Sequence, residues 1–556
     1  MKTFSAFPRW CLAAIILFVQ PIAYAVDNGS SAAARPVVFN VKAFGATGNG
    51  QTLDTEAVDR TIAAAAAAGG GTVYFPAGAY ACYTIDLKSN ITLYLDSGAT
   101  LLAADPPPEG EPGGYDAPEP NAFDKYQDFG HSHWRNSLIW GEGLQNISII
   151  GPGLIFGRGL SRGVGRKDPL PGEPYRALPP SRTNAVTAAT PFGYPSPLDA
   201  LPAGVGNKAI ALKNCRNVIF RDFTVFHGGH FAILATGVDN FTIDNLKIDT
   251  NRDGIDIDCC VNVRVSNCTV NSPTDDGICP KSSYALGHVR ATENLTIVNC
   301  QVSGYAEGSL LDGTYKRTSR SRNGRTGRIK FGTEANGGFK NITIANCVFD
   351  YCRGIALEEV DGGPLEDVSI SNITMRNIVN APIFIRLGAR LRGPGKPPVG
   401  MVRRINISNV VAYNVSANHG ILITGLPDHP IEDVSLSHIR IVYQGGGTKE
   451  QAFREVPEYE TDYPEPSRFG TIPSWGMFLR HVKGFRATDI ELSLMKDDFR
   501  PAFLLTDVKD AVFRFLGVPR VAKVPTFVLR DVEDFSVRES RPVPNTNLQK
   551  AEKRSL

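Results

Sequence analysis

Asn262-Val-Arg-Val-Ser-Asn-Cys-Thr-Val270 alternates apolar and polar residues, and variants of this phrase recur along most of the chain. The starts of the copies lie 22 to 47 residues apart, so a minimal turn of about 22 residues is lengthened by loops of different size. Short strands at such a period are typical of a solenoid. The first residues of the eight copies are Asn217, Asn240, Asn262, Asn294, Asn341, Asp367, Arg404 and Asp433.

The repeat predicts an all-β chain folded as a right-handed parallel β-helix, in which each coil buries its apolar face against its neighbours. A β-propeller or a β-sandwich fits less well, because both are built from antiparallel hairpins and few two-residue hairpin signals separate the copies. Asn at a fixed place in the phrase can bond its counterpart in the next coil and form a ladder. Cys268, Cys300 and Cys347 each follow such an Asn. We expect stacked buried thiols there, although a strand spacing of ~4.8 Å also permits a disulfide.

We interpret residues 38–540 as one β-helix domain. An alanine-rich run that begins after Asp54 or Thr55 and ends before Gly69 predicts a short helix, which can cap the N-terminal end of the coil. Residues 541–556 are predicted to form a flexible tail. Stretches that lack the repeat are predicted to be long loops, at 104–145, 157–205 and 303–327.

Residues 1–25 have the form of a secretory signal peptide, since Lys2 and Arg9 precede an apolar run and Ala23-Tyr24-Ala25 offers a cleavage site. The run is shorter than the ~20 residues that a membrane-spanning helix needs. We therefore expect an exported protein, secreted or periplasmic, without a membrane partner. The 58 basic and 56 acidic residues nearly cancel, so nothing in the charge suggests a nucleic-acid partner.

Three aspartates in the middle of the repeat are the candidate catalytic residues. Asp253 lies in Asn251-Arg-Asp-Gly254, and Asp275 and Asp276 follow 22 and 23 residues later in Thr274-Asp-Asp-Gly277. Because this spacing equals one coil, the carboxylates are expected to stack on one face, about one strand spacing (~4.8 Å) apart. Asp-Gly sequences also occur in turns for purely local reasons, so a structural interpretation stays open for any one aspartate.

These phrases resemble a known family. Asn40-Val-Lys-Ala-Phe-Gly-Ala-Thr-Gly-Asn-Gly50 and Gly69-Gly-Gly-Thr-Val-Tyr-Phe-Pro76 look like the opening of the pectin-degrading β-helix superfamily. The aspartate phrases, with Ile278-Cys-Pro-Lys-Ser282 after the doublet, are similar to glycoside hydrolase family 28, the polygalacturonases and rhamnogalacturonases. The resemblance extends from about residue 38 to residue 445.

The resemblance implies a hydrolytic mechanism. Inverting cleavage of a glycosidic bond needs a protonated carboxyl for the leaving oxygen and an ionised one to activate water, typically about 6.5–9.5 Å apart. By resemblance, Asp275 is the general acid, while Asp253 and Asp276 hold and activate the water. Three crowded carboxylates cannot all ionise easily, so one should keep a proton at a raised pKa. The expected partner is an acidic, galacturonate-containing or rhamnogalacturonan-type glycan, and we expect no cofactor and no metal.

Beyond the doublet the resemblance weakens. The family normally adds a Gly-His-Gly turn and, one or two coils later, an Arg-x-Lys pair that binds the substrate carboxylate. One alignment takes Gly332-Thr-Glu334 as the text after the turn, which puts Thr326 in place of the histidine and Ala356 and Glu358 in place of the pair. A second alignment reads Arg328-Ile-Lys330 as the pair itself. We prefer the first, under which both the histidine and the clamp are missing.

A basic insertion could do the work of the missing clamp, because Arg can hold a carboxylate in a bidentate fork. A solvated, mobile loop is the more usual structure for such a charge run. The insertion comprises Lys316, Arg317, Arg320, Arg322, Arg325, Arg328 and Lys330. The residues that we expect at the substrate site are Lys281, Arg328, Lys330, Glu334, Glu358 and His230, although a structural role for His230 is also open.

We therefore expect an inverting glycoside hydrolase, and the long loops, which could narrow its cleft, hint at attack on chain ends. Two alternatives stay open. A Ca²⁺-dependent polysaccharide lyase would use the three aspartates as ligands and Arg328 or Lys330 as the base. A carbohydrate-binding solenoid without catalysis would account for the missing histidine. The sequence does not indicate the oligomeric state.

Overall fold

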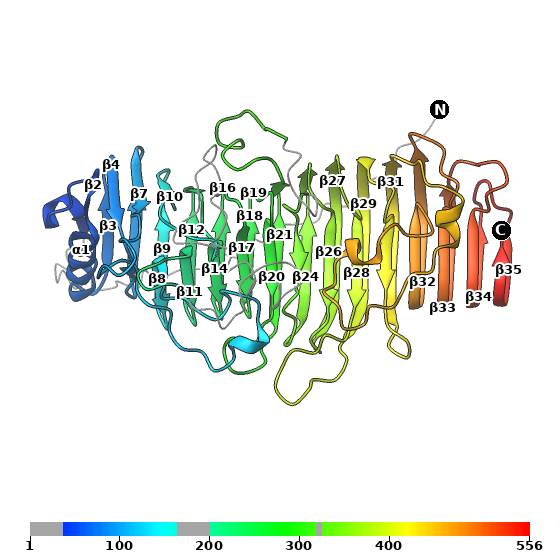
Figure 1. The fold of residues 1–556 in the computed structure, drawn as a ribbon, viewed down its shortest axis with the longest axis horizontal. Helices are drawn as coiled ribbons and strands as arrows, with labels where there is room; N and C mark the ends of the chain where they lie inside the picture. Colours follow the sequence, from blue (N-terminus) through cyan, green and yellow to red (C-terminus); the bar gives the residue numbers. More distant parts are fainter. Residues whose placement is uncertain (1–36, 164–200, 318–324) are drawn as a thin grey trace, which may run out of the picture.

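A computed structural model describes residues 37–163, 201–317 and 325–556 of the chain. The predicted signal peptide and the middle parts of the predicted loops 157–205 and 303–327 lie outside these ranges. The described strands form one sheet of 29 strands and one of 6, and every pairing except the last is parallel. Figure 1 shows them as a row of coils from the N-terminal to the C-terminal end. The predicted parallel β-helix is confirmed.

The six-stranded sheet forms the wall of the coil on which the candidate site lies. It consists of β5 (Ile85–Asp86), β8 (Ser137–Glu142), β11 (Lys208–Lys213), β14 (Phe231–Thr236), β17 (Asp253–Asp258) and β20 (Ile278–Lys281). The wall continues because Ile329 pairs with Ile278 and each following strand pairs with the one before. The continuation consists of β23 (Lys330–Phe331), β26 (Ile355–Glu359), β28 (Ile383–Leu387) and β30 (Ile421–Thr424).

The other two walls of the coil consist of two series of parallel strands, and the repeated phrase begins on a strand of the first series and ends on a strand of the second. The first series comprises β1 (Val38–Asn40), β3 (Gly71–Phe75), β6 (Ile91–Leu95), β9 (Gln145–Ile150), β12 (Arg216–Arg221), β15 (Asp239–Asp244), β18 (Val261–Ser266), β21 (Thr292–Val298) and β24 (Phe339–Ala345). The second series comprises β2 (Asn49–Leu53), β4 (Gly78–Cys82), β7 (Ala99–Ala103), β10 (Leu154–Phe156), β13 (Thr224–Phe226), β16 (Lys247–Asp249), β19 (Thr269–Asn271), β22 (Gln301–Ser303) and β25 (Val348–Asp350).

Toward the C-terminal end the walls merge into longer strands. β27 pairs with β24 of the first series and β25 of the second, β29 pairs with β27 and β31, and β32 pairs with β30 as well as β31. These strands are β27 (Pro364–Arg376), β29 (Met401–Val415), β31 (Ile431–Tyr443), β32 (Met477–Leu494), β33 (Phe503–Gly517) and β34 (Phe527–Arg538). Short 3-10 helices interrupt the loops at η1 (Val41–Phe44), η2 (Asp124–Tyr126), η3 (Glu450–Phe453) and η4 (Pro466–Phe469).

The core is a continuous column of apolar side chains inside the coil. Ile255, Ile278 and Ile329 lie above one another in register, and Ile355 and Ile383 continue the column. All five are buried. Side chains alternate between the two faces of a strand, so the residue next to each of these isoleucines points outward. The polar residues at the outward positions of β17, β20, β23 and β26 therefore lie on the outer face of the coil.

Helix α1 (Thr55–Ala67) lies at the N-terminal end of the coil, where Figure 1 shows it beside β2 and β3. Asp54 is its N-cap residue, but the carboxylate does not cap the helix. It accepts hydrogen bonds from the backbone N–H groups of Thr47 and Gly48, at 2.7 and 3.0 Å. Asp54 therefore ties the opening loop to the helix. The described part of the chain contains no helix long and apolar enough to cross a bilayer.

The prediction of a flexible tail was wrong. Residues after Arg541 return along the last coil as β35 (Thr546–Ser555), which pairs antiparallel with β34. Leu548 and Ala551 lie opposite Phe535 and Val532 in that pairing. The polar composition of the tail concealed the strand, because only the side chains facing the coil need to be apolar.

The predicted ladders and thiols are present. Asn299 donates to Asn267 and accepts from Asn346, at 3.2 Å in each case. These asparagines have positive φ, a conformation that Asn tolerates better than most residues. All nine cysteines in the described ranges are buried free thiols, including Cys268, Cys300 and Cys347, so the disulfide alternative is not realised.

Candidate active site

The three predicted aspartates come together at one end of the six-stranded wall. Asp253 is the first residue of β17, and Asp275 and Asp276 lie in the turn before β20. The two coils are hydrogen-bonded there, since Gly254 N donates to the Asp276 carbonyl at 3.0 Å. One carboxylate oxygen from each aspartate lies within 4.8 Å of the others. The juxtaposition inferred from the spacing is therefore found, while the catalytic roles stay predictions.

The three carboxylates differ in exposure. Asp253 and Asp276 are only 3% and 2% exposed, whereas the Asp275 side chain is 23% exposed. Arg252 lies between two of them, with a guanidinium nitrogen 2.6 Å from Asp275 and 3.6 Å from Asp253. A substrate would therefore meet Asp275 first, and the other two carboxylates lie behind it.

The electrostatic environments of Asp253 and Asp276 are opposite. Burial raises the pKa of Asp253 well above its usual value, and the nearby carboxylates of Asp275 and Asp256 raise it further. Burial also acts to raise the pKa of Asp276, but Lys330 and Arg328 outweigh it and hold that pKa well below its usual range. Of these two carboxyls, the environment of Asp253 therefore favours the protonated form and that of Asp276 the ionised form.

Two residues of the basic insertion create this difference. Arg328 Nε lies 2.9 Å from one oxygen of Asp276, and Lys330 Nζ lies 3.2 Å from the other. Both cations are buried, as is Arg325. The interpretation of the insertion as a solvated loop was therefore wrong for these three residues. It holds for Lys316 and Arg317, which are exposed, while Arg320 and Arg322 lie outside the described residues.

The order of the coils leaves room for the second alignment, which puts the pair one coil beyond the doublet, as well as for the first. Gly327 N donates to the Asp275 carbonyl at 2.8 Å, so Thr326 begins the coil that directly follows the aspartate doublet. Lys330 pairs in register with Ala356 of the next coil. Ala356 and Glu358 therefore lie two coils beyond the doublet, where the first alignment places the missing Arg-x-Lys pair.

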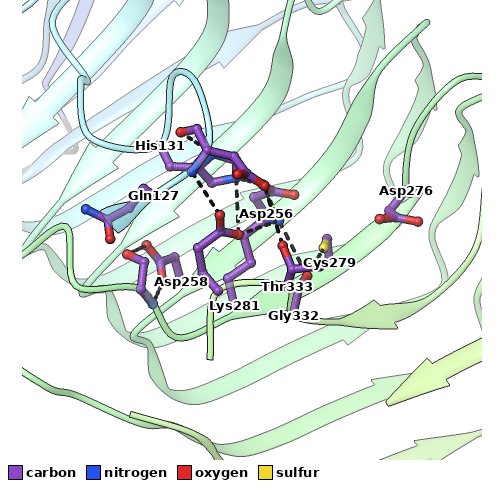
Figure 2. Close-up of polar contacts among 12 residues, drawn as sticks. Gln127, His131, Asp256, Asp258, Asp276, Cys279, Lys281, Gly332 and Thr333 are labelled. Carbon is purple, nitrogen blue, oxygen red and sulfur yellow. Dashed lines mark hydrogen bonds and ion pairs between the residues drawn. The ribbon is translucent and has the colours of Figure 1, made fainter. Parts of the chain in front are cut away.

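Lys281 and Glu334, both predicted at the substrate site, are buried beside it and paired with each other at 3.3 Å. Figure 2 shows Lys281 among Asp256, His131 and Cys279, with Asp276 standing apart to one side. Arg392 adds a contact to Glu334 at 2.8 Å. Protein partners thus surround both side chains, and their predicted contact with substrate has no support from this geometry.

Asp256 was given no role in the sequence analysis, yet it is buried behind Asp253. His131 Nε2 lies 3.5 Å from it and Lys281 Nζ lies 4.0 Å from it. Glu334 and Asp256 outweigh the effect of burial and raise the pKa of His131. The signal for Asp256 was its outward position on β17, three residues after Asp253, whereas nothing local marked His131, which is supplied by a loop 125 residues earlier in the chain.

His230, another predicted substrate ligand, is buried in the turn before β14. Its Nδ1 lies 2.8 Å from the Arg162 carbonyl oxygen, and its ring packs against Phe129 and Phe231. Burial and the nearby Arg252 hold the pKa of His230 well below its usual value. This environment is that of a neutral structural imidazole, and a role in substrate binding stays a prediction.

The loop between β31 and β32 contributes residues that sequence reasoning missed. Glu465 contacts both Arg328 and Arg353, the latter at 2.9 Å, and the Tyr463 hydroxyl lies 3.1 Å from Lys330 Nζ. These residues follow Asp276 by nearly 190 positions and carry no motif. Only the folded coil reveals that this loop reaches back to the site.

The residues at the site do not fit a resident Ca²⁺ ion. The three carboxylates could supply oxygen ligands, but Ca²⁺ takes six to eight of them. Each oxygen of Asp276 already faces a cation, and Arg252 bridges Asp253 and Asp275. A divalent ion would have to displace or withstand these positive charges. The lyase alternative, which needs this ion, is therefore disfavoured.

Two known sequence families match parts of the chain. The family described as "Rhamnogalacturonase A/epimerase, pectate lyase-like" matches residues 38–106, and the "Right handed beta helix region" matches residues 203–323. The second match agrees with the predicted handedness of the coil and covers the three aspartates.

Two relatives whose names state an activity match a larger part of the chain. The chain is 29% identical to an exo-poly-alpha-D-galacturonosidase of Dickeya chrysanthemi over 424 residues. This alignment covers 70% of the chain and 65% of that protein. The chain is 23% identical over 420 residues to a probable polygalacturonase of Vitis vinifera, covering 72% and 73%. The family 28 exopolygalacturonase of Yersinia enterocolitica has the same fold, with a TM-score of 0.54 at 18% identity over 92% of this chain and 80% of that one. The alignment thus spans just under two thirds of the length of the Dickeya relative. The aspartate phrases, the parallel coil and these relatives agree, and the chain is similar to the polygalacturonases of glycoside hydrolase family 28.

Proposed function

We propose that the protein is an inverting glycoside hydrolase that cleaves a galacturonate-containing or rhamnogalacturonan-type glycan. The observation that carries the proposal is the convergence of Asp253, Asp275 and Asp276 in unlike electrostatic environments. Hydrolysis needs one carboxyl that holds a proton and one that is ionised. Here burial alone favours the protonated form of Asp253, whereas burial beside two cations favours the ionised form of Asp276.

In the proposed mechanism, Asp275 protonates the leaving oxygen because it is the exposed carboxyl. Burial raises the pKa of Asp253, so this carboxyl can hold a proton close to Asp275 and pass it on to that residue. Asp276, ionised by Arg328 and Lys330, is the base that activates water.

The spacing fits a single water molecule between Asp253 and Asp276. Two hydrogen bonds of about 2.7–2.8 Å from one water to two oxygens span roughly 4.5–4.9 Å, and the carboxylate oxygens lie within 4.8 Å. This separation is shorter than the ~6.5–9.5 Å usual for inverting enzymes. The stereochemical outcome is therefore the part of the proposal that most needs direct measurement.

An acidic substrate is supported by the relatives and by charge. Two relatives are named for polygalacturonate or galacturonoside cleavage. Arg252 lies beside Asp275 and Asp253, where its guanidinium could also face a substrate carboxylate. The names of the Dickeya and Yersinia proteins also favour attack at chain ends. We further propose export of the protein, since its first 25 residues resemble a signal peptide.

The test is digestion of homogalacturonan and rhamnogalacturonan oligomers, with proton NMR of the first anomer released. An inverted anomer is expected, and a retained one would contradict the water position proposed here. Unsaturated products that absorb ultraviolet light and disappear with a chelator would instead establish the lyase alternative.

Asp275→Asn is the matching variant. We expect kcat to fall by about 10²–10⁴-fold with little change in thermal stability, because the amide cannot donate the proton. Asp239→Asn is the control, since Asp239 begins β15 on another wall of the coil and pairs with Arg290 instead of with the site residues. Equal activity of Asp275→Asn and the wild type would contradict the assigned acid, and binding without turnover in the wild type would support the non-catalytic solenoid.

A further inference from the structure

Glu358 occupies an unusual position two coils beyond Asp276. It is fully buried on the outer face of β26, and neither of its carboxylate oxygens has a hydrogen-bond partner among the described residues. One oxygen lies 3.8 Å from Arg328 and the other 3.8 Å from Lys330. These are the same two cations that hold Asp276 at 2.9 and 3.2 Å.

Ionisable groups from three parts of the chain outside β26 and β28 lie around Glu358. Arg328 and Lys330 precede or begin β23, and Asp276 lies in the turn before β20. Glu465 and Tyr463 reach in from the loop between β31 and β32.

Arg386 lies opposite Glu358 on β28 but donates to the carbonyl oxygens of Gly425, Glu458 and Tyr459. Glu359, the next residue along β26, accepts three backbone N–H groups of residues 361–363. Glu358 therefore faces cations that are already engaged and lacks the donors that stabilise its neighbour.

The geometry favours a protonated Glu358. A buried carboxylate without hydrogen bonds costs several kcal/mol, and attraction at 3.8 Å to cations already paired with Asp276 offsets little of that cost. Burial raises the pKa of Glu358 to about 8, against the lowering effect of Lys330 and Arg328. Glu465, by contrast, is ionised, because Arg328 and Arg353 outweigh its burial and lower its pKa.

We propose that Glu358 is a positioning residue whose proton keeps Arg328 and Lys330 directed at Asp276. While Glu358 is neutral, both cations are committed to Asp276 and keep it ionised as the base. When Glu358 loses its proton, it competes for the same two cations from the opposite side. This inference rests on the proposed function for its catalytic part, but the protonation of Glu358 can be tested without any substrate.

The charges of the cluster show what the proton adds. With Glu358 neutral, Arg328, Lys330 and Arg353 face only two ionised carboxylates, Asp276 and Glu465. One positive charge is left over, which an acidic glycan entering the cleft can neutralise. With Glu358 ionised, that positive charge is neutralised inside the protein. The affinity for an acidic substrate should then fall, and Asp276 should be less effective as a base.

The first experiment measures thermal stability against pH for the wild type and Glu358→Gln. The native protein keeps a proton that the unfolded chain releases near its ordinary pKa of about 4.3, so wild-type stability falls as pH rises from there toward about 8. The amide removes this loss. We expect the variant to gain melting temperature over the wild type as pH rises through that window.

A lower melting temperature of Glu358→Gln would contradict the proposal. If Glu358 were ionised between its cations, Glu358→Gln would leave a buried positive charge unbalanced and would melt lower at every pH, or fail to fold. Either outcome would overturn the proposal. Glu358→Met provides the same comparison with an apolar side chain of similar length and should behave like the amide.

The second experiment compares kcat/KM across pH. For the wild type we expect an alkaline decline of about tenfold per unit above the pKa of Glu358, and in Glu358→Gln this decline should move at least about one unit higher. Glu359→Gln is the matched control. The amide oxygen of the new Gln side chain can still accept the N–H groups of the turn, and Glu359 has no ion pair with Arg328 or Lys330 among the described residues. An unchanged alkaline decline in Glu358→Gln would overturn the positioning role.

The two experiments separate the inference from the proposed function. If no glycan is cleaved, the stability profiles still decide whether Glu358 carries a proton. If a glycan is cleaved while the stability profiles of wild type and Glu358→Gln run parallel, the function stands and the inference fails.

Discussion

At the residue scale, identical side chains behave differently because of the few atoms around them. Asp253 and Asp276 are both buried, yet only Asp276 has a cation at each oxygen. Burial alone raises a carboxyl pKa, whereas burial between cations lowers it. The sequence predicted that one of the three carboxyls would keep a proton, and the surroundings favour that proton on Asp253 over Asp276.

Lys330→Gln tests this account of Asp276. Lys330 contributes more than any other cation to lowering the pKa of Asp276, so its loss should raise that pKa, and the acidic limb of kcat/KM should move up by about one pH unit or more. The sign follows because Asp276 must be ionised to act as base. The measurement is a pH–rate profile from pH 3 to 8.

The same variant should lose about 3–5 kcal/mol of unfolding free energy at neutral pH, because Asp276 is left buried with one cation fewer. Lys509→Gln, which removes an exposed lysine paired with Glu533 on a distant coil, should change neither quantity. An acidic limb that stays in place in Lys330→Gln would show that Arg328 alone sets the charge of Asp276.

At the element scale, the repeated phrase sets both the strand and the turn that ends it. Its alternating apolar residues fill the column inside the coil, and its middle Asn turns the chain with positive φ while bonding the coils on both sides. These features could be predicted because they depend on residues close together in the sequence. The tail could not, because β35 depends on the exposed edge of β34.

Asn299→Ala should weaken the coil by about 2–4 kcal/mol, since it removes two side-chain hydrogen bonds and leaves a residue with a Cβ at φ +56°. Asn299→Gly removes the same hydrogen bonds, but glycine tolerates positive φ. This variant should therefore lose about 1–2 kcal/mol less unfolding free energy than Asn299→Ala. Denaturant unfolding measures both variants. Equal losses would mean that the hydrogen bonds alone account for the asparagine.

At the scale of the whole molecule, a parallel coil has two open ends, and each needs a cover. At the C-terminal end β35 pairs with β34 and shields Phe535 and Val532. The loop between β31 and β32 performs a different long-range task, since it reaches back along the coil to bring Glu465 to Arg328.

Truncation after Arg541 should therefore expose a sheet edge and its apolar residues. We expect a lower melting temperature and concentration-dependent association, because an unpaired edge can pair with another chain. Light scattering and thermal melting measure the two effects. Lys550→Gln, which alters β35 only on an exposed side chain, is the control, and a truncated protein as stable and monodisperse as this control would show that β35 adds nothing.

The sequence by itself determined the parallel coil, the asparagine ladders and the meeting of Asp253 with Asp275 and Asp276, because all three follow from a repeat of fixed period. Only the tertiary structure decided the partners of those aspartates. The sequence offered Arg328 and Lys330 as substrate ligands or as members of a solvated loop, and Glu465 lies far away in the sequence, yet each is buried beside Asp276 or its cations. The physical reason is that a repeat specifies which residues stack, whereas burial and long-range loop contacts specify which of the stacked groups carry charge.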